Sequence, residues 1–138
     1  MRIFLDANVI VSVLNNEYPL FTYSSRVLSL ADNKKFKVFT SPVCLAIAFY
    51  FSEKKSGKDL AKKKISLLAQ KLHISEMGKK EVLQAVQSAK MKDFEDAMQY
   101  FSALNSRCDV IITEDKSGFY YSKIKVTGAE DFLINMAF

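Results

Sequence analysis

Acidic side chains occur at three places along the chain where they could act together on a metal ion. Asp6 interrupts the apolar run "IFLDANVIV", where a carboxylate without a counter-charge is costly. Asp93 and Asp96 stand three apart in "DFEDA", a spacing that puts both on one helical face. Glu114 and Asp115 follow the apolar run "DVIIT". Carboxylates are the preferred ligands of Mg²⁺ and Mn²⁺, which activate water and stabilise in-line displacement at a phosphate.

The neighbours of these acids sharpen the prediction. Asn8 and Thr113 offer uncharged oxygen donors near the same two chain positions, and Glu114 is a further supporting acid. Glu95 is expected to point elsewhere on its helix than its two acidic neighbours. His73, in "KLHIS", has an apolar setting and is expected to be structural.

Each acidic position also has a structural explanation. Asp6 could cap the helix that follows it, and Asp93 could be an N-cap with Asp96 at the third position. Glu114 and Asp115 could be ordinary turn residues. A single acid would favour the structural explanation, but all three groups at one end of a sheet favour a metal site.

The elements that must position these acids alternate between strands and helices. Short apolar runs predict strands over residues 2–5, 36–40, 72–74, 109–113 and 124–126. Helical spacing and start signals predict a short helix from residue 7 that is ended by Asn15, Asn16 and Pro19, and helices over residues 20–35, 41–55, 58–71, 81–90, 93–106 and 128–138. This order predicts an α/β fold in which a parallel sheet is covered on both faces. The carboxyl ends of the strands, where Asp6 and Asp115 fall, are where such sheets form sites.

The composition is that of a globular protein. The chain has 138 residues, 49% of them hydrophobic, and is expected to form a single domain over 1–138. The net charge of +5 mildly favours an anionic partner such as nucleic acid. Cys44 and Cys108 sit against apolar runs and are expected to be small buried residues. No run has the length of a membrane span and no signal peptide is evident, so a cytoplasmic protein is expected.

Five motifs in order resemble the PIN domain, and most closely the VapC-like ribonuclease toxins of toxin–antitoxin pairs. They are "FLDANVIV", "TSP" opening an apolar helix, "DFEDAMQYFSAL", "CDVIITEDKSGF" and "VTGAEDFL", which together span essentially the whole chain. The resemblance implies a Rossmann-like three-layer α/β/α sandwich with a central parallel sheet. It also implies an endoribonuclease that depends on Mg²⁺ or Mn²⁺, acts on RNA, forms a homodimer and is inhibited by a cognate antitoxin.

The resemblance assigns roles to individual residues. Asp6 matches the first family aspartate, Asp96 matches the aspartate of the later helix with Asp93 beside it, and Asp115 is the best match to the fourth acid. Asp6, Asp96 and Asp115 are therefore the predicted catalytic residues, and these three with Asp93 are the predicted metal ligands.

Two departures from the family pattern stand out. The helix after "SP" usually carries a glutamate, but the matching position here holds Ala46 or Ile47. Relatives often read "TRNxxDF" after the fourth strand, whereas this chain reads "TEDKSGF", with Gly118 in place of the aspartate. The alternative prediction is therefore a degenerate PIN domain that binds RNA or a protein partner without cleaving.

Basic and apolar surfaces suggest partners. Lys54, Lys55, Lys58 and Lys62 cluster in "SEKKSGKDLAKKK", which favours either phosphate contacts with RNA or a solvated helix face. The run "LAIAFYF" is apolar nearly all round, and the part outside the core is a candidate dimer or antitoxin groove. A dinucleotide-binding fold is disfavoured, since no glycine follows the first strand to admit a pyrophosphate.

Overall fold

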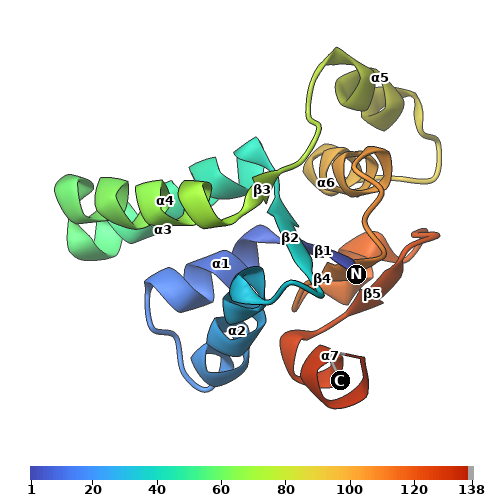
Figure 1. Ribbon diagram of the computed structural model, residues 1–138. Coiled ribbons are helices and arrows are strands. Elements are labelled where there is room, and N and C mark those ends of the chain that lie inside the picture. Colours follow the sequence, from blue (N-terminus) through green and yellow to red (C-terminus); the bar gives the residue numbers. More distant parts are fainter. Residues whose placement is uncertain (137–138) are drawn as a thin grey trace.

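The computed structural model, which describes residues 1–136, is built around a parallel sheet (Figure 1). The strand order is β3-β2-β1-β4-β5. The strands are β1 (Arg2–Leu5), β2 (Lys37–Thr40), β3 (His73–Ile74), β4 (Val110–Ile112) and β5 (Lys125–Thr127). Each neighbouring pair is parallel, so all carboxyl ends meet at one edge of the sheet. The α/β sandwich with a parallel sheet is confirmed.

Helices cover both faces of the sheet. They are α1 (Ala7–Leu14), α2 (Leu20–Ser29), α3 (Pro42–Ser56), α4 (Lys58–Lys71), α5 (Lys79–Gln87), α6 (Phe94–Asn105) and α7 (Ala129–Asn135). In Figure 1, α1, α2 and α7 lie on one side of the sheet and α5 and α6 on the other, while α3 and α4 run side by side away from it.

The middle strand explains how the first acid is placed. Ile3, Phe4 and Leu5 of β1 are fully buried, because β1 pairs with β2 on one side and β4 on the other. In the register with β4, Leu5 lies opposite Ile112. The next residues of the two strands, Asp6 and Thr113, therefore leave the sheet side by side.

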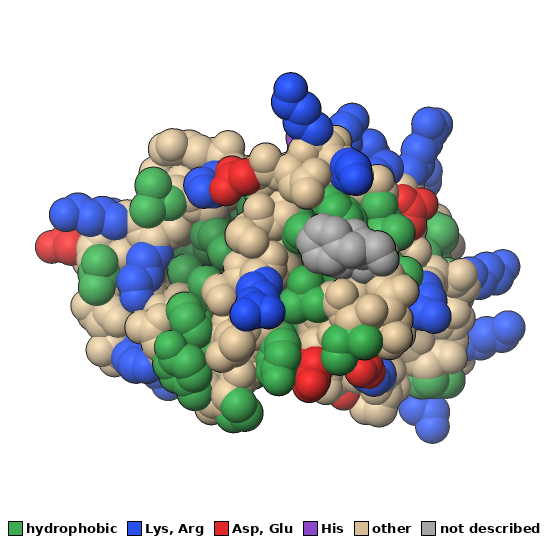
Figure 2. All heavy atoms as spheres, turned by 60° about the horizontal axis from the view of Figure 1, so that its bottom comes forward, with side chains coloured by type: hydrophobic (Ala, Val, Ile, Leu, Met, Phe, Trp, Pro, Cys, Tyr) green, Lys and Arg blue, Asp and Glu red, His purple; other side chains and the backbone are tan. Residues whose placement is uncertain are grey.

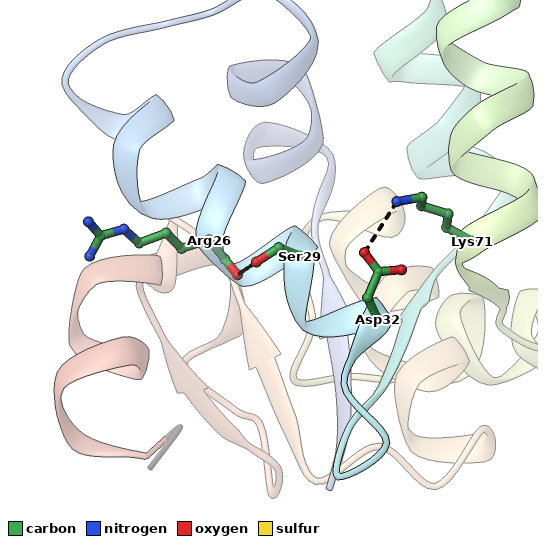
Figure 3. A network of polar contacts seen from close by, with 4 residues as sticks. All are labelled: Arg26, Ser29, Asp32 and Lys71. Atoms are coloured by element: carbon green, nitrogen blue, oxygen red, sulfur yellow. Dashed lines mark hydrogen bonds and ion pairs between the residues drawn. The ribbon is translucent and has the colours of Figure 1, made fainter.

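Several element ends differ from the sequence prediction. The helix predicted over residues 20–35 stops at Ser29 and continues as the 3₁₀ turn η1 (Leu30–Asp32), which leads into β2. Lys71, the last residue of α4, pairs with Asp32 of this turn at 3.3 Å (Figure 3). Close by, the Ser29 hydroxyl donates to the Arg26 carbonyl oxygen. The ion pair joins the turn to the end of α4, whereas the Ser29 bond lies within the last turn of α2.

Other differences are smaller. The helix predicted over residues 81–90 is α5 and begins two residues earlier, and a 3₁₀ turn η2 (Lys116–Phe119) follows β4, where only a loop was expected. The final predicted helix is observed as α7, and the last two residues of its predicted range lie outside the described residues.

The remaining expectations concern single residues and the membrane. Cys44 and Cys108 are buried free thiols, as predicted. His73 is exposed on the edge strand β3 and stacks on Phe39 with ring centres 5.0 Å apart, so its setting is less apolar than expected. None of the helices in the described part of the chain has the length and apolar character of a membrane span.

Candidate active site

A pocket of about 420 Å³ opens at the carboxyl edge of the sheet. Five of its lining side chains are carboxylates, and they come from β1's end, the loop before α2, the start of α6 and the turn after β4. They are Asp6, Glu17, Glu95, Asp96 and Asp115. Apolar side chains of α1, α2 and α3 complete the wall, and the described lining residues include no Lys or Arg.

Asp6 is held at the base of this pocket by both of its oxygens. Its Oδ1 accepts the Ala7 backbone N–H at 2.8 Å, which caps the start of α1, and its Oδ2 accepts the Thr113 hydroxyl at 2.8 Å. Only 8% of Asp6 is exposed. Burial raises the pKa of Asp6, the two hydrogen bonds lower it, and the nearby Asp115 raises it further. Asp6 therefore both caps α1 and lines the pocket.

Thr113 connects three of the predicted residues. Its fully buried Oγ1 donates to Asp6 and accepts from the Asn8 side-chain amide at 3.0 Å and from the Asp115 backbone N–H at 3.1 Å. The Asn8 amide oxygen in turn accepts the Glu114 backbone N–H at 3.2 Å. This network fixes the turn after β4 against the start of α1, so Thr113 supports the pocket from behind and Asn8 lines it.

Asp96 enters the pocket from the first turn of α6. Its pKa is raised to about 7, first by burial and then by the neighbouring carboxylates of Asp93, Asp6, Asp115 and Glu95. Its carboxylate lies against Gly118: a Cβ at position 118 would come within 2.4 Å of Asp96 Oδ2. The space that a longer residue at position 118 would need is therefore taken by Asp96.

The positions of Asp93 and Glu95 relative to the pocket are the reverse of those that the helical spacing predicted. Asp93 is the N-cap of α6, where its Oδ1 accepts the Asp96 backbone N–H at 2.9 Å, and it is exposed. Glu95 lines the pocket with Asp6 and Asp96. The prediction that Glu95 points elsewhere was wrong. The spacing of i and i+3 identifies one helix face, but a long side chain in the first turn can reach a pocket beside that face.

The two acids in the turn after β4 point in different directions. Asp115 lines the pocket and accepts the Ser117 hydroxyl at 2.7 Å. Glu114 turns away and accepts the Ala129 backbone N–H at 3.0 Å, which places its carboxylate at the start of α7. Glu114 therefore stabilises a helix start by charge and hydrogen bonding rather than lining the pocket. Glu17, which does line it, comes from a loop with no motif that would have identified it.

The donor set of the pocket matches a hard divalent cation. Neighbouring carboxylates raise the pKa values of Asp6, Glu95 and Asp96, so these three are harder to ionise, and a bound cation would reverse that penalty. As placed, no three His, Cys, Asp or Glu side chains in the described residues converge closely enough to form a ready-made metal cluster. The chemistry of the donors fits the ion, and closing around it requires side-chain rotation.

The four lysines of the predicted RNA-binding patch fall into two groups, two with local contacts and two that are exposed. Lys55 Nζ donates to the Asn15 carbonyl oxygen at the end of α1, and Lys54 Nζ lies 4.4 Å from the centre of the Tyr50 ring. Lys58 and Lys62 are exposed on α4. Figure 2 shows Lys and Arg side chains spread over one face of the molecule rather than gathered in one patch. The local contacts of Lys55 and Lys54 make the structural explanation sufficient for those two residues.

An apolar groove of about 510 Å³ adjoins the acidic pocket along α3. It is lined by Val43, Ala46, Ile47, Tyr50, Phe51 and Glu95. Tyr50 and Phe51 are 51% and 45% exposed, so the run "LAIAFYF" does leave part of its apolar surface outside the core.

Comparisons with known proteins agree with this geometry. The family model described as PIN domain matches residues 2–117. A curated relative, Ribonuclease VapC1 of Aquifex aeolicus (strain VF5), is 31% identical over 135 residues, which cover 95% of this chain and 92% of the relative. Among solved structures, VapBC-1 from nontypeable Haemophilus influenzae matches with a TM-score of 0.71 at 17% identity, covering 94% of this chain and 99% of that one. Mycobacterium tuberculosis VapC20, described as a Sarcin-Ricin loop cleaving toxin, matches with a TM-score of 0.66 at 17% identity, covering 89% and 98%.

Proposed function

The chain belongs to the PIN-domain family, and from that premise we propose that it is a VapC-like ribonuclease, the toxin of a toxin–antitoxin pair, that hydrolyses RNA phosphodiesters with a divalent cation. The observation that carries this proposal is the pocket lined by five carboxylates, with no basic side chain among its described lining residues. Such a pocket repels a phosphate unless a cation is present. The name and identity of the Aquifex relative support the ribonuclease activity.

Asp6, Asp96 and Asp115 are the residues we propose to hold the ion, which is Mg²⁺ or Mn²⁺. When bound, such an ion supplies an activated water and stabilises charge at the phosphate. Thr113 and the Ala7 N–H orient Asp6 before the ion arrives, which lowers the entropy lost on binding. The raised pKa of Asp96 means that this side chain releases a proton when it becomes a ligand near neutral pH.

A protein inhibitor is the proposed partner. The solved structure from Haemophilus influenzae that matches this chain is described as VapBC-1. In this chain the apolar groove along α3 opens next to the acidic pocket and shares Ile47, Phe51 and Glu95 with it. A partner segment in that groove would cover the pocket. A homodimer and a cytoplasmic location remain parts of the same proposal.

Cleavage of RNA by the purified protein tests the proposal. Wild type is expected to cleave a mixed RNA substrate with Mn²⁺ and to stop when EDTA is added, and Asp6→Asn and Asp96→Asn are each expected to lose at least about 100-fold in rate. Glu130→Gln, an exposed acid of α7, is the matched control and should cleave like wild type.

The same comparison with and without EDTA distinguishes the proposed ribonuclease from the alternative, a degenerate PIN domain. A degenerate domain would bind RNA equally well with and without EDTA and would show no cleavage above the Asp6→Asn background. Cleavage by both aspartate variants at the wild-type rate would contradict the assigned residues.

A further inference from the structure

The wall of the acidic pocket formed by α3 carries no acid. Ile47 lines both the pocket and the adjoining apolar groove, and Ala46 lines the groove. The nearest acid on α3 is Glu53, which is not among the lining residues of either cavity in the described structure. A carboxylate that binds a metal ion at this wall must therefore come from an element other than α3.

Glu95 lies at this wall. It is the one acid that lines both cavities, and it does so together with Ile47 and Phe51 of α3, although it belongs to α6. The ion pairs of the described residues, Lys71 with Asp32 and Lys116 with Asp131, leave Glu95 without a basic partner. Asp6, at the end of β1, lines the same pocket as Glu95. Glu95 is therefore an uncompensated carboxylate between Asp6 and the apolar wall.

Glu95 and Asp96 are consecutive residues in the first turn of α6. Asp93 caps the helix through the Asp96 backbone N–H, so the first turn is ordered from its first residue. Asp96 fills the space next to Gly118 of η2, while Glu95 lines the pocket together with Ile47 and Phe51 of α3. One helix start thus supplies two of the five carboxylates of the pocket, and Glu95 is the one that also lines the groove along α3.

We propose that Glu95 is a ligand of the divalent cation and supplies from α6 the carboxylate that position 47 of α3 does not provide. This inference rests on the proposed metal-dependent function and adds a residue to it. It also accounts for Ile47 without loss of a carboxylate from the pocket, because Glu95 takes the place of the acid that α3 lacks and is consecutive in the chain with Asp96.

Calorimetric titration of Mn²⁺ into the EDTA-treated and dialysed protein tests the proposal without reference to activity. Glu95→Gln should weaken Mn²⁺ affinity by at least about tenfold, since even outer-shell partners of metal ligands contribute that much. The double variant Glu95→Gln with Ile47→Glu should recover most of that loss, because it returns a carboxylate to the same wall. Glu130→Gln, also a glutamate in the first turn of a helix, should bind like wild type.

Asp6→Asn in the same titration separates the two proposals. If Asp6→Asn loses Mn²⁺ binding while Glu95→Gln keeps wild-type affinity, Glu95 is no ligand and only the present inference fails. If both variants bind Mn²⁺ like wild type, the ion does not bind in this pocket and the proposed function fails as well. Weak binding by a folded double variant, judged by circular dichroism, would overturn the equivalence of Glu95 and position 47.

Discussion

The Thr113 hydroxyl donates a 2.8 Å hydrogen bond to Asp6 Oδ2 across 107 residues of sequence. Both residues directly follow neighbouring parallel strands, so the bond joins the ends of β1 and β4. It gives the buried carboxylate a partner that carries no charge. Asp6 therefore stays available to a cation, which a lysine or arginine in the same place would exclude.

Thr113→Val keeps the shape of the side chain and removes its hydroxyl. The buried Asp6 oxygen and the Asn8 amide would each lose a hydrogen bond, so the free energy of unfolding should fall by about 1–3 kcal/mol in urea denaturation. Thr127→Val, at the same edge of the sheet, is the control. Its hydroxyl makes a single 3.3 Å bond to the Gly128 carbonyl oxygen, and it should cost less. Equal losses in the two variants would contradict a special role for Thr113.

Asp96 should make the metal-free protein less stable as pH rises. The pKa of Asp96 is raised from 3.8 to about 7 in the folded protein, so between these values the folded state binds more protons than the unfolded chain. The free energy of unfolding then falls as pH increases from about 4 to about 7. Urea denaturation in EDTA at several pH values measures this slope, which Asp96→Asn should reduce.

Asp59→Asn on the exposed start of α4 is the control for that slope and should leave it unchanged. A slope in Asp96→Asn as steep as in wild type would show that other carboxylates, such as Asp6, carry the whole effect.

Gly118 and Asp96 should be energetically coupled. The Cβ of Gly118→Ala would lie 2.4 Å from Asp96 Oδ2, so Asp96 must move when it is introduced. In an Asp96→Ala background that clash is gone. A double-mutant cycle should therefore give a coupling free energy of about 0.5–1 kcal/mol, with Gly118→Ala the more costly in wild type. Additive effects would mean that Asp96 does not occupy the space beside Gly118.

Lysines of the basic segment should fall into two functional groups. Lys55→Met removes a donor to the last turn of α1 and should lower the free energy of unfolding by about 1 kcal/mol. Lys58→Met with Lys62→Met should leave stability within about 0.5 kcal/mol, since both are exposed on α4. If these two contact phosphates, the double variant weakens RNA binding and flattens its salt dependence, measured by fluorescence anisotropy. Unchanged salt dependence would remove them from the RNA surface.

Much of the fold was predictable because its signals are local. Apolar strand-length runs, caps such as Ser41 before Pro42, and the alternation of strands with helices define a parallel α/β sheet, and each depends on a few neighbouring residues. The end of α2 at Ser29 was missed, because the helical spacing of apolar residues continues to Ala31 and no glycine or proline marks the stop.

The sequence by itself determined that Asp6 and Asp115 meet at one sheet edge, since parallel strands bring their carboxyl ends together whatever their side chains do. Only the tertiary structure decided which other acids join them. It placed Glu95 in the pocket, set Asp96 against Gly118, and turned Glu114 toward α7. Those outcomes depend on how α3, α6 and η2 are placed around the sheet, and such long-range packing has no period in the sequence from which it can be derived.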